Sequence, residues 1–197
     1  MPGQSQKTSN TVRIIGGQWR SRKLYFSNIQ DLRPTPDRVR ETVFNWLQPV
    51  IVGSRCLDLF SGSGALGLEA LSRGAAHCLF IDKHPQSMTD IQHNLALLKT
   101  DAGETMTGDS LQILKRLHES PSDKQFSVVF VDPPYAMNCA LECCQLLVEH
   151  HWLTNDAYIY IESSATIDEQ QLPPQWKLLR QKKAGNVHYH LAIQQKS

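Results

Sequence analysis

The stretch Cys56–Ala70, with the sequence CLDLFSGSGALGLEA, constrains the fold of this chain more than any other. It begins with an apolar run that contains one carboxylate, turns through Ser61–Gly64, and continues with leucines at helical spacing. Glycines let a backbone turn tightly and approach a ligand closely, and the start of a helix presents free amide groups. The stretch therefore predicts a buried strand, a glycine corner and a helix, as in nucleotide-binding α/β proteins.

The glycine spacing alone leaves the ligand open. Gly62, Gly64 and Gly67 satisfy G-x-G-x-x-G, but no Lys-Ser or Lys-Thr follows them as in a phosphate-binding loop. The same spacing also fits a purely structural turn between strand and helix. An acidic residue, Asp82, closes the next predicted strand 18 residues after Gly64, near the offset of about 20 at which a carboxylate binds ribose hydroxyls. Asp82 is therefore predicted to bind a ribose.

Predicted strands and helices alternate along most of the remaining chain. Thr35 precedes a proline and apolar residues at helical spacing, so it is the expected N-cap of a helix that ends before Pro49. The other expected elements are helices at 87–99, 110–118 and 139–150, and strands at 77–81, 104–107, 126–131, 157–161, 176–183 and 187–194. This order predicts an α/β fold: a seven-stranded, mostly parallel sheet that ends in a C-terminal antiparallel hairpin and carries helices on both faces. Ligands of such sheets bind at the carboxyl ends of the strands.

The N-terminal part of the chain is basic. Residues 1–11 are expected to be disordered, residues 12–34 to form a small β-hairpin extension, and residues 35–197 to form the main domain. Residues 1–40 carry a net charge of +6 and the remainder −5. Such an arm suits the phosphate backbone of a nucleic acid, although a solvated charged face gives the same count. Trp19 either stacks on a base or packs beneath the hairpin. The candidate nucleic-acid residues are Arg13, Trp19, Arg20, Arg22, Lys23 and Arg33.

Several other classes of protein fit the sequence poorly. The five cysteines are an odd number, and Cys139 and Cys143 lack a second pair at ligand spacing, so we expect reduced, buried thiols. His188 and His190 alternate on one strand without a third ligand, and no metal is expected. No apolar run approaches the roughly 18 residues of a membrane span, and the polar N-terminus lacks a secretory signal. We expect a cytoplasmic monomer that contacts no membrane.

A second motif narrows the class. The stretch Phe126–Tyr135, FSVVFVDPPY, reads as a buried strand that ends in Asp-Pro-Pro-Tyr. Together with the glycine corner, it resembles the Rossmann-like, class I S-adenosylmethionine-dependent methyltransferases that act on exocyclic amines. The segments Arg13–Arg20 and Leu32–Thr42 look like the opening signature of the RsmD-type 16S ribosomal RNA guanine-N2 methyltransferases. This resemblance covers about residues 12 to 195.

The resemblance implies a catalytic role for Asp132, Pro133 and Tyr135. The Asp132 carboxylate and the Pro133 carbonyl are two acceptors that match the two hydrogens of a guanine N2 amine. Engaging both hydrogens would aim the nitrogen lone pair at a sulfonium methyl group, so catalysis would come from orientation and electrostatics. Tyr135 would stack on the extruded base. Whether Asp132 or water accepts the proton is left open.

The resemblance also implies S-adenosyl-L-methionine as the cofactor and S-adenosyl-L-homocysteine as its product. Arg38 would pair with the methionine carboxylate or remain an exposed surface residue. Asp58 would order the glycine loop or meet the amino group of the cofactor, and Phe60 would line the cofactor wall. The segment Gly108–Ser110 would hold the adenine. The candidate cofactor residues are Arg38, Asp58, Phe60, Gly62, Gly64, Asp82, Lys83, Asp109 and Ser110.

The leading hypothesis is methylation of the N2 amine of a guanine in small-subunit ribosomal RNA. The alternatives are methylation of another planar amine, such as adenine N6 or a protein glutamine, a non-catalytic RNA-binding ribosome assembly factor, and a nicotinamide oxidoreductase. Relatives that act on adenine or glutamine usually carry asparagine where this chain has Asp132. Because no separate recognition domain is predicted, an assembled or partly assembled ribosomal particle is the expected partner.

Overall fold

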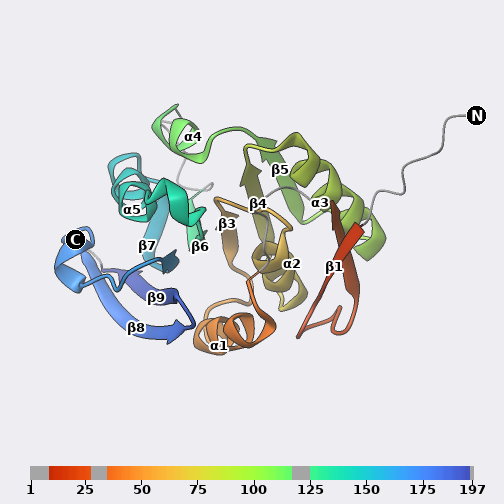
Figure 1. The fold of residues 1–197 in the computed structure, drawn as a ribbon, viewed down its shortest axis with the longest axis horizontal. Coiled ribbons are helices and arrows are strands. Elements are labelled where there is room, and N and C mark those ends of the chain that lie inside the picture. Colours follow the sequence, from red (N-terminus) through yellow and green to blue (C-terminus); the bar gives the residue numbers. More distant parts are fainter. Residues whose placement is uncertain (1–8, 28–34, 117–124, 196–197) are drawn as a thin grey trace, which may run out of the picture.

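The structure, a computed structural model, describes residues 9–27, 35–116 and 125–195. A seven-stranded sheet runs through the centre of the molecule (Figure 1) in the order β5-β4-β3-β6-β7-β9-β8. Its strands are β3 (Arg55–Asp58), β4 (His77–Asp82), β5 (Gly103–Thr107), β6 (Phe126–Val131), β7 (Leu153–Ser163), β8 (Trp176–Ala184) and β9 (Val187–Gln194).

The sheet is parallel from β5 to β7, and β9 runs antiparallel to both of its neighbours. This arrangement confirms the predicted fold, including the C-terminal hairpin. The chain moves outward from β3 to β4 and β5 and then returns to β6 on the other side of β3, so the strand order changes direction between β3 and β6. Loops at the carboxyl ends of the parallel strands face one common edge of the sheet, which we call the carboxyl edge.

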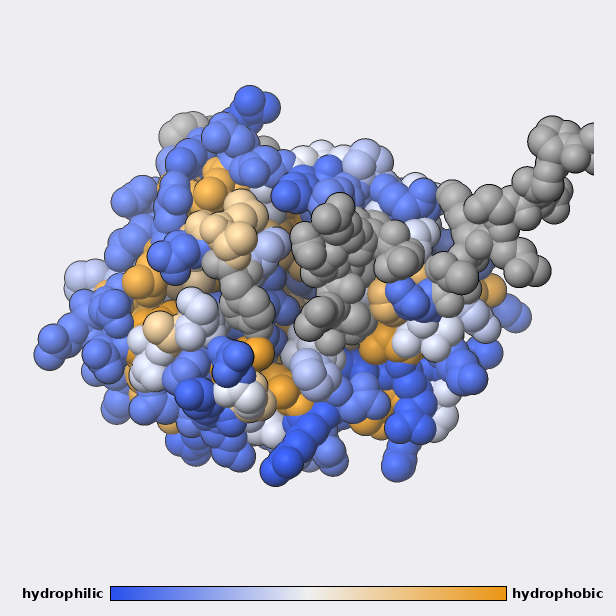
Figure 2. Space-filling view, in the orientation of Figure 1, coloured by the Kyte–Doolittle hydropathy of each residue, from blue (hydrophilic) through white to orange (hydrophobic). Residues whose placement is uncertain are grey.

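Helices cover both faces of the sheet. One face packs against α1 (Asp37–Leu47), α2 (Ala65–Ser72) and α3 (Pro85–Leu98), with Phe44, Leu68 and Ile91 among the buried side chains. The other face packs against α4 (Ser110–Arg116) and α5 (Ala140–Glu149). Short 3₁₀ helices lie at η2 (Tyr135–Met137) and η3 (Glu169–Gln171). In Figure 2 hydrophilic residues cover most of the outline, and hydrophobic residues appear between them.

The expected N-terminal hairpin is present as β1 (Ser9–Arg13) and β2 (Lys23–Ser27), which pair antiparallel. β1 starts at Ser9, so residues 9–11 are strand, whereas the sequence placed them in a disordered tail. The hairpin lies against α3 (Figure 1), where the Asn94 side chain accepts a hydrogen bond from the Tyr25 N–H and donates one to its carbonyl. The Asn94 amide thus makes the two backbone hydrogen bonds that a neighbouring strand would make to Tyr25. These bonds fix the hairpin to the main domain.

Of two local expectations, the N-cap at Thr35 is wrong and the free, buried cysteines are confirmed. Thr35 is not the N-cap of α1, because Pro36 occupies that position and the Thr35 hydroxyl bonds elsewhere. All five cysteines are free and buried, as expected of reduced thiols. Within the described residues, no helix is long and apolar enough to cross a membrane.

Candidate active site

The glycine corner is built as the sequence predicts. Gly64 is the N-cap of α2 and has a φ of +75°, a left-handed conformation that residues with a Cβ rarely adopt. Gly67 lies where α2 crosses the sheet, and a Cβ there would come within 2.2 Å of the Phe80 ring and 2.7 Å of the Cys78 sulfur. The first glycine therefore serves the turn, and the second allows close packing of helix on strand.

Two buried carboxylates hold this corner in place. Asp58 accepts a hydrogen bond of 3.0 Å from the Gly67 N–H in the first turn of α2. Asp82 accepts one of 2.9 Å from the Gly62 N–H through Oδ2, and one of 2.8 Å from the His84 N–H through Oδ1. Asp58 thus holds the first turn of α2, directly after the glycine loop that it was expected to order. A carboxylate has about four lone-pair positions, so Asp82 retains acceptor capacity for a ribose hydroxyl.

The segment Gly108–Ser110, which was predicted to hold the adenine, lies beside Asp82, because the Gly108 N–H donates a hydrogen bond to the Asp82 carbonyl. The Ser110 hydroxyl donates a hydrogen bond to the Leu59 carbonyl, which ties the start of α4 to the end of β3. Asp109 is exposed, and its Oδ1 accepts a hydrogen bond of 3.0 Å from the Gln112 N–H. Phe60 is half-buried against the core, and Lys83 is exposed. These residues lie at or next to the carboxyl edge.

Asp132 and Glu162 form a carboxyl pair at the same edge. Val131 of β6 lies opposite Ile161 of β7, so the residues that follow them come side by side. The Thr35 hydroxyl donates a hydrogen bond of 3.3 Å to Asp132 Oδ2. The Tyr160 hydroxyl donates one of 2.6 Å to Glu162 Oε1. Two segments distant from Asp132 in the sequence, the residue before Pro36 and the end of β7, therefore supply the groups around it.

Burial raises the pKa values of two of these acidic groups, Asp132 and Asp58. Burial raises the pKa of Asp132 well above its usual value, the carboxylates of Glu162 and Asp58 raise it further, and the Thr35 hydrogen bond acts against them. Burial likewise raises the pKa of Asp58 to about 7, against a lowering by the Gly67 N–H and a further raising by Asp82. This concentration of perturbed carboxyl groups is typical of an active site.

The raised pKa of Asp58 leads to a test by pH. The native group binds a proton more tightly than the unfolded one, so its contribution to stability is complete below about pH 3.8 and is lost as the pH rises through about 7. Asp58→Asn keeps an acceptor for the Gly67 N–H and cannot ionise. We expect this variant to unfold at a higher temperature than the wild type at pH 8, with the difference closing toward pH 4. Asp101→Asn, at an exposed aspartate, is the control. A difference that does not depend on pH would contradict the assignment.

Three further predicted residues, Pro133, Tyr135 and Arg38, lie at or near this edge. Pro133 is buried beside Asp132, and Tyr135 begins η2, although its side chain lies outside the described part of the structure. Arg38 is exposed in the first turn of α1, two residues after the N-cap. Since Thr35 contacts Asp132, the start of α1 lies at the carboxyl edge. The position of Arg38 is therefore compatible with its predicted role.

The basic turn of the N-terminal hairpin, which carries Arg20 and Arg22, lies away from the carboxyl edge. The Gln18 N–H bonds to the Ser72 carbonyl and the Trp19 N–H to the Ser72 hydroxyl, at the end of α2. α2 starts at the carboxyl edge and runs back for eight residues, or about 12 Å, so this turn lies at the opposite edge of the sheet. Trp19 is half-buried against the core, which favours the packing role. Arg13, Arg20, Arg22 and Lys23 are exposed, and Arg33 lies outside the described residues.

The sequence patterns indicated no role in the active site for Glu162 or Thr35, and they did not indicate the ion pair of Arg40 and Glu69. An acidic residue directly after a buried strand was a usable signal for Glu162, because it follows the same pattern as Asp82 and Asp132. Arg40 and Glu69 are fully buried in α1 and α2 and approach within 3.5 Å. Nothing in the spacing of α1 and α2 along the chain indicated that these two side chains meet.

The sheet order, the glycine corner and the acidic groups at the carboxyl edge define a Rossmann-like, S-adenosylmethionine-dependent class I methyltransferase. The family model described as "Conserved hypothetical protein 95" matches residues 12–193, and the chain belongs to this family, as the RsmD-type signature predicted.

Named relatives agree with this assignment. "Ribosomal RNA small subunit methyltransferase D" of Escherichia coli (strain K12) is 44% identical over 183 residues, which cover 93% of this chain and 90% of that protein. The protein of the same name from Haemophilus influenzae is 43% identical over 191 residues, with 95% and 96% covered. The solved structure "Putative methyltransferase yhhF from Escherichia coli" has a TM-score of 0.85 at 43% identity and covers 94% of this chain and 99% of that one.

Proposed function

We propose that this protein transfers a methyl group from S-adenosyl-L-methionine to the exocyclic N2 amine of a guanine in small-subunit ribosomal RNA. The names of its relatives support a ribosomal RNA substrate. The observation that carries the choice of amine is the juxtaposition of Asp132 and Glu162 at the ends of β6 and β7. This pair presents acceptors in a place where the resemblance puts the target base.

A second carboxylate beside Asp132 favours guanine over adenine. The N2 amine of guanine neighbours the N1–H, so these two adjacent groups both present donors to a pair of carboxylates. The N6 amine of adenine neighbours an unprotonated N1, which is an acceptor and would be repelled by a carboxylate. Asp132 and the Pro133 carbonyl would take the amine hydrogens, and Glu162, held by the Tyr160 hydroxyl, would take the N1–H. The same argument disfavours a glutamine amide, which has no such neighbouring donor.

The residues of this site would act mainly by orientation. With both amine hydrogens engaged, the nitrogen lone pair is drawn out of conjugation with the ring and points toward the methyl donor. Positive charge then develops on the nitrogen as the new bond forms, and the carboxylates of Asp132 and Glu162 stabilise it. Because Asp132 takes up a proton at a higher pH than an isolated aspartate, it is suited to receive the amine proton afterwards.

The cofactor-binding residues fit the proposed methyl donor. When bound, S-adenosyl-L-methionine supplies a sulfonium methyl group, and the product is S-adenosyl-L-homocysteine. Gly64 and Gly62 leave a corner without side chains at the start of α2, and Asp82 offers a carboxylate for the ribose. Asp109 and Ser110 border the adenine side, and Arg38 the methionine carboxylate. We propose no metal, and within the described residues no group of three or more His, Cys, Asp or Glu could hold one.

We further propose that the substrate is an assembled or partly assembled small ribosomal subunit and that the enzyme acts in the cytoplasm as a monomer. The chain is short and spans nearly the full length of its relatives, so a separate recognition domain is not part of the matched region. A preformed ribonucleoprotein surface would then supply much of the specificity.

The decisive experiment identifies the product. Purified protein is incubated with a labelled methyl donor and with small subunits from cells that lack it, and the RNA is digested to nucleosides. We expect label in N2-methylguanosine at a single position. Label in N6-methyladenosine or in protein would overturn the choice of amine, and absence of label from both subunits and naked RNA would overturn the function.

A further inference from the structure

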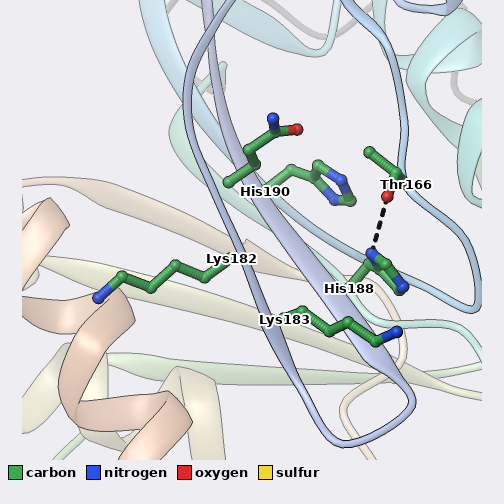
Figure 3. A pocket seen from close by; sticks show the side chains of 6 residues that line it. Thr166, Lys182, Lys183, His188 and His190 are labelled. Carbon is green, nitrogen blue, oxygen red and sulfur yellow. Dashed lines mark hydrogen bonds between the residues drawn. The ribbon is translucent and has the colours of Figure 1, made fainter.

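A pocket of about 230 Å³ lies on the C-terminal hairpin. Its walls come from β8, β9 and the segment after β7, as Figure 3 shows. The His188 ring lies 2.9 Å from the Thr166 hydroxyl. Lys183 reaches past His188 on this side of the hairpin, while Lys182 points to the opposite side, toward α1.

One wall of the pocket is rigid. His190 is 1% exposed, and its Nε2 accepts a hydrogen bond of 3.1 Å from the Ile167 N–H. Its Nδ1 lies 3.4 Å from the Ile161 carbonyl, so the ring is held between β7 and the segment that follows it. These contacts fix the chain at Thr166 relative to the hairpin. This wall of the pocket is therefore a packed part of the fold, and the exposed side chains of β8 line the other side.

The pocket lies at the carboxyl edge, next to the proposed catalytic pair. His188 lies opposite both Ser163 at the end of β7 and Lys183 in β8. Lys183 is thus two strand spacings, about 10 Å, from Ser163 on one face of the sheet, whereas the neighbouring Glu162 is level with Tyr189 and Lys182 on the other face. A smaller pocket at the same edge is lined by Pro133, Glu162 and Ser163, among others. The chain from Glu162 to Thr166 therefore borders both the catalytic loop and the basic pocket.

The hairpin carries positive charge without acidic neighbours in the sequence. From Trp176 to the C-terminus the chain contains no Asp or Glu, and its basic residues are Lys177, Arg180, Lys182, Lys183 and Lys196. Among the described residues, Lys183 forms no salt bridge, and its side chain is exposed. The basic turn of the N-terminal hairpin cannot supply charge here, because it lies at the opposite edge.

We propose that this pocket binds a backbone phosphate of the RNA next to the target guanine, with Lys183 as the cation and Thr166 and His188 as hydrogen-bonding partners. The proposal rests on the proposed function, since it assumes an RNA substrate at Asp132. A base extruded into the catalytic loop carries its flanking phosphates outward along the same edge. A lysine two strand spacings, about 10 Å, from Ser163, the residue after Glu162, is placed to neutralise one of them.

The test compares Lys183→Ala with Lys177→Ala. Both lysines are exposed on β8, but Lys177 pairs with Ile193 at the other end of the hairpin, so the control removes the same charge from the same strand. Binding of small subunits from cells lacking the protein is measured without methyl donor over a range of salt concentrations. Lys183→Ala should weaken binding several-fold and reduce the slope of log affinity against log salt by about 0.7 to 0.9, which corresponds to one phosphate. Lys177→Ala should match the wild type, and Lys183→Arg should restore most of the slope.

Methylation kinetics supply a second readout. Lys183→Ala should raise the KM for small subunits and leave kcat and the KM for the methyl donor unchanged. Equal salt slopes for Lys183→Ala and Lys177→Ala would overturn the phosphate site, even if the wild type makes N2-methylguanosine. Conversely, a normal loss of slope in Lys183→Ala with no methylation by the wild type would overturn the proposed function and leave RNA binding at the pocket intact. Binding that depends on Lys183 only in subunits with intact proteins, and not in the stripped RNA, would assign the pocket to a protein partner instead.

Discussion

Asp132→Ala should abolish methyl transfer while leaving the protein folded. In the proposed mechanism, the substitution removes an acceptor for the amine and a carboxylate that stabilises the nitrogen as it becomes cationic. Loss of one such preorganised group commonly costs about 100-fold to 1,000-fold in rate, and we expect at least that loss in kcat. The measurement is single-turnover transfer of labelled methyl groups to unmethylated small subunits at saturating donor.

The fold should tolerate this change, which makes the result interpretable. Because burial and neighbouring carboxylates raise the pKa of Asp132, its charge opposes folding at neutral pH, and the thermal midpoint of the variant should be equal to or above that of the wild type. Binding of the methyl donor, measured by calorimetry, should also be unchanged. Asp101→Ala, at an exposed aspartate after α3, is the matched control. Transfer within a few-fold of the wild type in Asp132→Ala would refute the proposed mechanism.

Glu69→Ala should lower the stability of the protein strongly, because it removes a fully buried charge. Both Glu69 oxygens are used: they accept 2.8 Å hydrogen bonds from the Ile15 and Gly16 N–H groups, and one also accepts 2.7 Å from Arg73 Nε. The fully buried Arg40 lies 3.5 Å away. Removing one partner of a buried ion pair typically costs about 3 to 5 kcal/mol. Arg40 would keep its 2.7 Å ion pair with the half-exposed Asp37 but would lose its buried partner. For a chain of this size the thermal midpoint should fall by roughly 6 to 20 °C.

Two variants separate the buried charge from a general effect of losing a glutamate. Glu104→Ala removes a largely exposed glutamate, 3.7 Å from His77, and should change the free energy of unfolding by less than about 0.5 kcal/mol. Glu69→Gln keeps an acceptor oxygen but not the charge, so its loss should lie between the two. Chemical denaturation measures all three. A loss below about 1 kcal/mol in Glu69→Ala would show that the ion pair does not hold the hairpin to α1 and α2.

Most of the fold could be predicted because the central strands and helices have strong local patterns. The run of bulky residues around Leu57, the periodicity from Met88 to Leu98 and the turn at Gly185 each specify one element without reference to the rest of the chain. The ends of elements were less accurate. Thr35 looked like an N-cap because its hydroxyl can accept from a helix N–H, yet that hydroxyl donates to Asp132, 97 residues away. A long-range hydrogen bond replaced the local one.

The candidate site was predictable where each residue follows a strand. Asp82 and Asp132 end apolar runs, and the carboxyl ends of parallel strands must meet at one edge, so their proximity follows from the pattern. The positions of the basic residues could not be predicted in this way. The count of basic residues singled out the N-terminal arm, but α2 carries the turn of that arm to the far edge, while the C-terminal hairpin brings Lys183 to the near one. Net charge along the chain says nothing about which edge of a sheet a turn occupies.

The class of protein follows from local features that short segments encode: a glycine corner between strand and helix, an acidic residue after the next strand and an Asp-Pro-Pro-Tyr loop. Three relations become visible only once the chain is folded: the pairing of Asp132 with Glu162, the burial of Arg40 against Glu69 and the position of the basic residues relative to the carboxyl edge. The physical reason is that these relations depend on sheet register and helix packing, which join segments far apart in the chain.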